Sequence, residues 1–264
     1  MFLQQPAESP YDIRFSLMGF STRISWSFWI VAVVLGYDLA QYIDSAFADT
    51  SPGAFALLLI WVGCMAASIL VHELGHAVAF RRYGIESSIV LYYLGGLAIP
   101  VTSFRGSRSF RSVGSREDLI IAAAGPAFQI GSAIVVVLIA WLADYRVSLL
   151  LELIPNQFVN LRQTLGGQQF DNATTFALVN FYVWPSVLWG LLNLVPVLPL
   201  DGGRIAKAII EMQGGASVTA MWLSVITAAL LALYGFNNDQ LFLGIFFASL
   251  AINNYQAIQP GNPW

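Results

Sequence analysis

The chain contains two histidines, and both stand in the segment His72-Glu73-Leu74-Gly75-His76. On an α-helix, residues four apart lie on one face about 6 Å from each other, so both imidazoles can bind one metal ion. Zinc accepts nitrogen ligands in a tetrahedral arrangement. A carboxylate beside the first histidine can take a proton from metal-bound water. The spacing therefore predicts a catalytic zinc site, with His72 and His76 as ligands and Glu73 as general base.

The alternative is a pair of structural core histidines that bond to backbone carbonyls, with Glu73 as a local partner. The surrounding sequence favours the metal site. From Ala54 to Phe80, Glu73 is the only acidic or basic residue apart from the two histidines. An ionisable side chain at membrane depth is energetically unfavourable, so its presence indicates a functional role.

The composition is that of a polytopic membrane protein. Hydrophobic residues make up 57% of the chain, charged residues 10%, and the mean hydropathy is +0.68. The single cysteine, Cys64, excludes an intrachain disulfide and a cysteine zinc cluster. A net charge of −3 without a basic tract gives no indication of nucleic-acid binding. The N-terminus lacks a signal-peptide pattern, so the first span is expected to direct insertion.

Six segments are long and apolar enough to cross a bilayer, which needs about 20 residues per helix. They are Ile24–Tyr42, Ala54–Phe80, Leu119–Leu142, Phe176–Leu198, Ser217–Tyr234 and Leu241–Ile258. We expect an all-α polytopic fold that forms a single membrane-embedded domain over residues 1–264. The Asn253-Asn254 pair is either a helix end or a bonding group for neighbouring helices.

Two shorter apolar segments lie between these spans. Ile89 to Val101 is too short to cross, and Gly95-Gly96 divides it into two β-rich halves. It predicts a small β-hairpin that dips into the membrane between the second and third spans; simple interfacial packing is the alternative. Val147–Ile154 is apolar enough to lie along the outer membrane surface.

The arginines and lysines predict the orientation. Ten of the twelve fall on one side of the six spans: Arg14, Arg23, Arg81, Arg82, Arg105, Arg108, Arg111, Arg116, Arg204 and Lys207. Arg146 and Arg162 fall on the other side. By the positive-inside rule, both termini face the cytoplasm. His72 and His76 precede Arg81 by about two helical turns, so the active site is expected near the cytosolic side of the membrane.

Because the chain has no third histidine, a carboxylate must complete the zinc site. The candidate is Asp201, which follows Pro196 and Pro199 and precedes Gly202-Gly203. The prolines interrupt helical hydrogen bonding and the glycines allow unusual dihedral angles, so the backbone can turn Asp201 inward. The alternatives are a helix end in which Asp201 pairs with Arg204, and a third ligand supplied by Glu86 or Glu117.

With these residues in view, the chain resembles the site-2 proteases, the intramembrane zinc metalloproteases. The resemblance rests on the His72–His76 motif, Asn193 to Gly203, Tyr83-Gly84 followed by Gly95-Gly96, and Ala124-Gly125-Pro126. Leu198 and Gln129 depart from it, because the family usually has proline and asparagine at these positions. No accessory peptide-binding module is evident.

The resemblance implies a zinc-dependent endopeptidase that performs regulated intramembrane proteolysis on a single-span transmembrane substrate. It implies one Zn²⁺ per chain, held by His72, His76 and Asp201, with Glu73 as general base. Asn193 would lie near the scissile carbonyl, and the strands around Gly95 and Gly96 would border the site and pair with unwound substrate. The alternative is an inactive membrane scaffold or transport-like protein with a structural metal. The sequence does not indicate the oligomeric state.

Overall fold

The computed structural model describes residues 7–100, 113–153 and 159–259, and the chain divides into two compact units. The first, which we call the histidine unit, comprises Gln5–Val101 and Ala127–Gly190. The second, the aspartate unit, comprises Met1–Gln4, Thr102–Pro126 and Leu191–Trp264. Each unit has its own apolar core.

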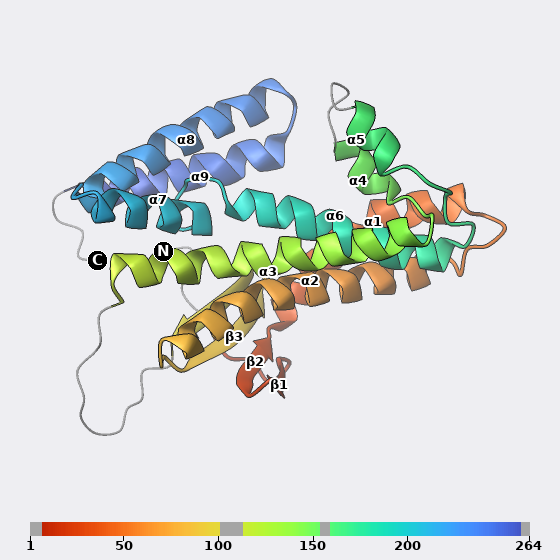
Figure 1. Ribbon diagram of the computed structural model, residues 1–264, viewed down its shortest axis with the longest axis horizontal. Coiled ribbons are helices and arrows are strands. Elements are labelled where there is room, and N and C mark those ends of the chain that lie inside the picture. The colour runs from red at the N-terminus through yellow and green to blue at the C-terminus, as the bar shows by residue number, and fades with distance from the viewer. Residues whose placement is uncertain (1–6, 101–112, 154–158, 260–264) are drawn as a thin grey trace. The chain divides into compact units, whose positions relative to one another are not determined.

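The described residues form nine helices, labelled in Figure 1. They are α1 (Trp26–Ala46), α2 (Ala54–Arg82), α3 (Ser115–Leu142), α4 (Ser148–Leu153), α5 (Val159–Thr164), α6 (Ala173–Asn193), α7 (Asp201–Met212), α8 (Ser217–Asn237) and α9 (Leu241–Ile258). Six of them, α1, α2, α3, α6, α8 and α9, are long and apolar enough to span a membrane. The expectation of six spans is therefore confirmed.

Seven of the twelve predicted span ends differ from the structure by two to five residues, and two of them have a clear physical reason. The first helix begins at Trp26 rather than Ile24, because Ile24 is the last residue of a strand. The fourth span ends at Asn193 rather than Leu198. Pro196 and Pro199 follow it and cannot donate the backbone hydrogen bonds that a continued helix requires.

The predicted hairpin is present and belongs to a larger sheet. Strands β3 (Ser87–Tyr92) and β4 (Gly95–Pro100) pair antiparallel; Val101 lies outside the described residues. An N-terminal hairpin that the sequence analysis did not predict, β1 (Ile13–Leu17) and β2 (Phe20–Ile24), completes the order β1-β2-β3-β4. Strand β2 leads directly into α1 and pairs parallel with β3. The N-terminal hairpin therefore lies beside the strands that follow α2.

The sheet packs on α2, the helix that carries both histidines. Both β3 and β4 contact α2. Residues Ile89 to Tyr92 of β3 are almost completely buried, as expected for a central strand covered on both faces. The guanidinium of Arg81 stacks 3.6 Å from the centre of the Phe20 ring and donates to the Met18 carbonyl at 2.9 Å. These contacts fix the end of α2 against the β1–β2 turn.

A close helix contact holds α1 against α2. A Cβ atom on Gly36 would lie 2.0 Å from the Trp61 ring, so only glycine fits there. The Trp61 indole N–H donates to the Ala32 carbonyl at 2.9 Å. Small residues at such a contact let two membrane helices approach closely.

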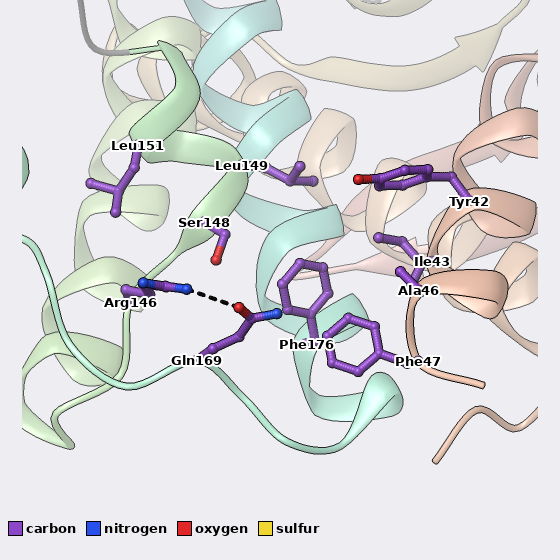
Figure 2. A pocket seen from close by; sticks show the side chains of 10 residues that line it. All are labelled: Tyr42, Ile43, Ala46, Phe47, Arg146, Ser148, Leu149, Leu151, Gln169 and Phe176. Carbon is purple, nitrogen blue, oxygen red and sulfur yellow. Dashed lines mark hydrogen bonds between the residues drawn. The ribbon is translucent and has the colours of Figure 1, made fainter. Parts of the chain in front are cut away.

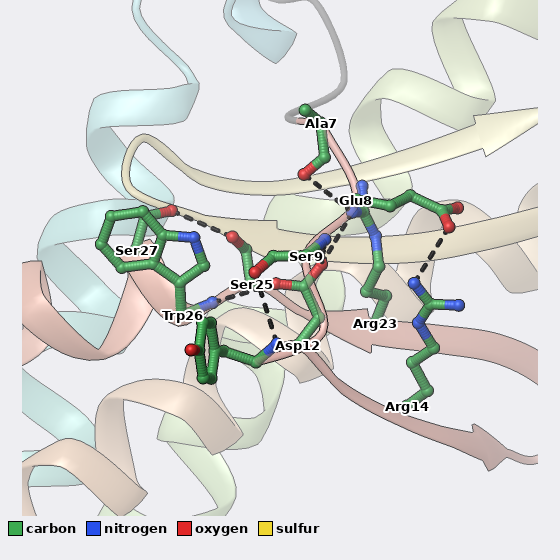
Figure 3. A network of polar contacts seen from close by, with 10 residues as sticks. Ala7, Glu8, Ser9, Asp12, Arg14, Arg23, Ser25, Trp26 and Ser27 are labelled. Atoms are coloured by element: carbon green, nitrogen blue, oxygen red, sulfur yellow. Dashed lines mark hydrogen bonds and ion pairs between the residues drawn. The ribbon is translucent and has the colours of Figure 1, made fainter.

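A buried ion pair fastens the N-terminal segment to the sheet (Figure 3). The Arg23 guanidinium donates to Asp12 Oδ2 at 3.0 Å, and both side chains are almost fully buried. The backbone N–H groups of Ser9 and Trp26 also donate to the Asp12 carboxylate, at 3.0 and 3.3 Å. Burial raises the pKa of Asp12, but these hydrogen bonds and the charge of Arg23 outweigh it and hold the pKa below its ordinary value.

We expect Asp12→Asn to loosen the N-terminal hairpin at neutral pH. The lowered pKa means that ionised Asp12 stabilises the fold above pH 3.8, and this contribution is lost as pH falls through the folded-state pKa. Faster hydrogen exchange of the β1 and β2 amides in the variant at pH 7 checks the expectation, after correction for intrinsic exchange rates. The difference from the wild type should shrink as the pH falls below the ordinary pKa of an aspartate, and a difference that does not shrink at any pH at which the protein stays folded would contradict the assignment.

Candidate metal centre

Helix α2 brings the two histidines and Glu73 together in the histidine unit. All three are buried, with 2%, 3% and 5% of the surface of His72, Glu73 and His76 exposed. The Nε2 atoms of His72 and His76 lie 3.2 Å apart. Two zinc–nitrogen bonds of about 2.0–2.1 Å at a tetrahedral angle separate their nitrogens by about 3.3–3.4 Å. The two imidazoles therefore fit a single zinc ion.

A glutamine on α3 orients the first histidine. His72 Nδ1 lies 2.9 Å from Gln129 Oε1, and the Gln129 amide group donates to the Ser68 hydroxyl at 2.9 Å. Because Gln129 then presents its oxygen, His72 donates from Nδ1–H and keeps the Nε2 lone pair for a metal. Ser186 Oγ lies 2.8 Å from Ser68 Oγ and extends the buried chain to α6. The sequence marked Gln129 as a departure from the family pattern but did not reveal this contact.

We expect Gln129→Leu to weaken zinc binding by about 10- to 100-fold, the usual effect of losing a hydrogen bond that orients a metal-binding histidine. Chelator competition on the purified protein measures this affinity. The variant Gln129→Glu retains an acceptor oxygen and should recover most of it. Equal zinc affinity in wild type and Gln129→Leu would show that Gln129 has no role in orienting His72.

Strand β4 passes directly against the Glu73 side chain. A Cβ atom on Gly96 would lie 2.4–2.6 Å from Cγ, Oε1 and Cδ of Glu73. At Gly95, φ is +113° and a Cβ would lie 2.5 Å from the Trp189 ring, so this position also requires glycine. Within the described residues β4 is an edge strand of the sheet. The two glycines therefore bring an edge strand to the carboxylate of the predicted general base.

In the aspartate unit, Asp201 begins α7 and is buried. The chain from Leu194 to Leu200 is not helical and folds back on the first turn of α7. A Cβ on Gly202 would lie 2.2 Å from the Leu194 carbonyl oxygen, and one on Gly203 would lie 2.3 Å from the Leu198 nitrogen. Both positions need glycine because the loop backbone occupies the space that a side chain at Gly202 or Gly203 would fill.

The last two spans hold this loop in place. The Leu198 N–H donates to Ser224 Oγ on α8 at 3.0 Å. The Asn254 amide on α9 donates to the Leu198 carbonyl at 2.6 Å and to the Leu250 carbonyl at 2.8 Å. Asn254 thus lies inside α9 rather than at a helix end, and its partner outside α9 belongs to the loop before Asp201 rather than to a neighbouring helix. Helices α8 and α9 therefore support the backbone that precedes Asp201.

Arg204 is shared between two carboxylates. It forms a hydrogen-bonded ion pair with Asp118, and its Nη1 lies 3.9 Å from Asp201 Oδ1. Asp118 is thus the closer partner of Arg204, and the ion pair of Arg204 with Asp201 is the longer of the two. Of the alternative third ligands, Glu86 is exposed, and Glu117 is half-buried and accepts the Gly114 N–H at 3.3 Å.

The predicted site residues fall into two groups. His72, Glu73, His76, Gly95 and Gly96 lie in the histidine unit, where α2 and β4 bring Glu73 and Gly96 into contact. Asn193, the last residue of α6, and Asp201 lie in the aspartate unit at the two ends of one loop.

Comparison with known proteins assigns a family to this arrangement. The model of peptidase family M50 matches residues 60–233, which include the histidine motif and Asp201. Rip3 of Mycobacterium tuberculosis is 29% identical over 215 residues, which cover 77% of this chain and 44% of that protein. Zinc metalloprotease MJ0392 of Methanocaldococcus jannaschii is 27% identical over 207 residues, or 78% of this chain and 47% of that protein.

The chain thus spans less than half the length of these curated relatives. Among solved structures, the site-2 protease from Methanocaldococcus jannaschii aligns over 96% of this chain and 98% of its own, with 21% sequence identity and a TM-score of 0.49.

Proposed function

Because the chain belongs to peptidase family M50, the site-2 proteases, we propose that it is an intramembrane zinc endopeptidase. It hydrolyses a peptide bond within or near a transmembrane segment of a membrane protein. The observation that carries this proposal is the pair of buried imidazole nitrogens 3.2 Å apart, beside buried Glu73, on a helix apolar enough to span a membrane.

The proposed zinc ligands are His72, His76 and Asp201, in agreement with the family motifs. Three protein ligands leave one position for water or substrate, as catalytic zinc requires, whereas structural zinc usually has four. Bound zinc would polarise the scissile carbonyl and lower the pKa of its water. Glu73 would accept a proton from the attacking water and pass it to the leaving amine. Asn193 donates a hydrogen bond to the developing oxyanion.

The proposed substrate is a single-span transmembrane protein. A transmembrane helix hides its peptide bonds in its own hydrogen-bond ladder, so the segment to be cut must first unwind. An unwound segment can pair with the edge strand β4. The contact between Gly96 and Glu73 would bring that segment to the general base.

The proposed orientation follows the arginine distribution. Both termini face the cytoplasm, and the active site lies near the cytosolic side of the membrane. We also propose that residues 1–264 act as one metalloprotease domain, since the matched region, residues 60–233, includes all three proposed ligands and residues of both compact units.

Zinc content tests the ligand set. Elemental analysis of purified, folded wild-type protein should give about one zinc per chain, and Asp201→Ala should lose most of it because two histidines alone hold the ion weakly. Glu86→Ala and Glu117→Ala, made in the same way, should keep their zinc. Retention in Asp201→Ala with loss in either glutamate variant would overturn the assignment of Asp201 as ligand.

A further inference from the structure

A pocket of about 350 Å³ lies in the histidine unit, away from the histidines and Glu73. Figure 2 shows its polar and apolar sides. Arg146, Ser148 and Gln169 form the polar side, and the Ser148 hydroxyl points toward the Arg146–Gln169 hydrogen bond. The remaining lining consists of Tyr42, Ile43, Ala46, Phe47, Leu149, Leu151 and Phe176. The pocket therefore offers a cationic, hydrogen-bonding end next to an apolar wall.

The pocket lies at the ends of membrane spans. Its residues Tyr42 to Phe47 close α1, a helix of 21 residues and about 31 Å, which is the thickness of a bilayer hydrocarbon core. Phe176 belongs to the first turn of α6, which runs back from the same side. At this depth the hydrocarbon core meets the headgroup layer, where tyrosine is enriched. In a bilayer spanned by α1, the apolar wall would meet acyl chains and the polar end would meet phosphates.

The polar groups retain unused hydrogen-bonding capacity. The Arg146 guanidinium donates to Gln169 Oε1 at 2.8 Å, and within the described residues no carboxylate lies within ion-pair distance of it. The Ser148 hydroxyl oxygen is buried and has no hydrogen-bond partner among the residues that the structure describes. A buried hydroxyl without a partner is unfavourable, so it indicates a ligand oxygen that the protein itself does not supply. Arginine presents its N–H groups in a planar fork that suits phosphate oxygens.

We propose that this pocket binds the phosphodiester of a membrane phospholipid. Arg146 and Ser148 donate to the phosphate oxygens, and the first part of one acyl chain lies on Ile43, Phe47 and Phe176. The apolar wall favours a phospholipid over free phosphate, because inorganic phosphate leaves that wall exposed to water. The site is separate from the zinc centre and does not depend on proteolytic activity.

Binding of a short-chain phospholipid to the detergent-purified protein tests this site. The probe is dihexanoyl-phosphatidylglycerol, followed by native mass spectrometry or a rise in melting temperature. Arg146→Met should weaken binding about tenfold or more, as expected for a lost charge-assisted contact. Arg14→Met removes an exposed arginine of the N-terminal hairpin, outside the described lining of the pocket, and should leave binding unchanged. Unaltered zinc content confirms that each variant is folded.

Further outcomes bear on the proposal. Dihexanoylglycerol, which lacks the phosphate, and inorganic phosphate alone should each bind much more weakly than the phospholipid. If inorganic phosphate binds as tightly as the phospholipid, the site is for free phosphate. If dihexanoylglycerol binds as tightly as the phospholipid, the pocket is a plain apolar groove.

If Arg146→Met does not fold, binding by Ser148→Ala and Arg146→Lys is measured instead, because each variant should weaken binding. Wild-type affinity in both would overturn the site.

Discussion

Replacing Glu73 by glutamine is expected to abolish peptide-bond hydrolysis while about one zinc per chain is retained. Glu73 is buried beside both histidines, and an amide cannot accept a proton at neutral pH. General-base catalysis contributes about 10²- to 10⁴-fold, so cleavage should fall by at least that factor. The measurement is cleavage of a single-span reporter protein co-reconstituted in liposomes, with zinc determined by elemental analysis on the same preparation.

The matched control for this variant is Glu8→Gln, the same substitution at an exposed residue that pairs with Arg14. It should retain both zinc and cleavage. Full activity of Glu73→Gln would contradict the role of Glu73 as general base. Zinc without any hydrolysis in the wild type, tested over a set of single-span reporters, would instead favour the inactive scaffold.

The histidine pair could be predicted from the sequence because its geometry is local. On any α-helix, His72 and His76 lie on one face, and the structure places their Nε2 atoms 3.2 Å apart. The six spans were also predictable, since length and apolar composition are properties of continuous segments. The end of α6 was not located correctly, because the apolar run continues to Leu198 although the helix stops before Pro196.

Contacts between distant residues could not be predicted. Gln129 is 57 residues from His72, and nothing in either segment alone reveals their hydrogen bond. Strand β2 precedes α1 and β3 follows α2, so their parallel pairing likewise joins residues that are far apart in the sequence. The hairpin of β1 and β2 did carry a local signal: Ile13, Phe15 and Leu17 alternate with polar residues, and Gly19 adopts φ +83° in the turn. The sequence analysis missed this hairpin because its strands are short and a segment with a much stronger helical pattern follows.

Replacing Gly96 by alanine is expected to lower proteolysis by about 100-fold while zinc binding is kept. The new methyl group would lie 2.4 Å from Glu73 Cγ and 2.5 Å from Oε1, so either the carboxylate or strand β4 must move. A displacement of about 1 Å in a catalytic group is enough for an effect of this size. The three atoms nearest the methyl position all belong to Glu73 rather than to His72 or His76, so the zinc content should stay near one.

Gly63→Ala provides the matched control, because Gly63 lies on α2 as well and no described atom is within 4 Å of its Cβ position. Alanine at a helix position with free space is favourable by about 1 kcal/mol relative to glycine, so this variant should keep full activity. A Gly96→Ala protein with zinc and wild-type cleavage would show that β4 can move away from Glu73 without consequence. Loss of cleavage together with loss of zinc would indicate general damage to the centre, whereas loss of cleavage alone identifies the contact between β4 and Glu73 as part of the catalytic geometry.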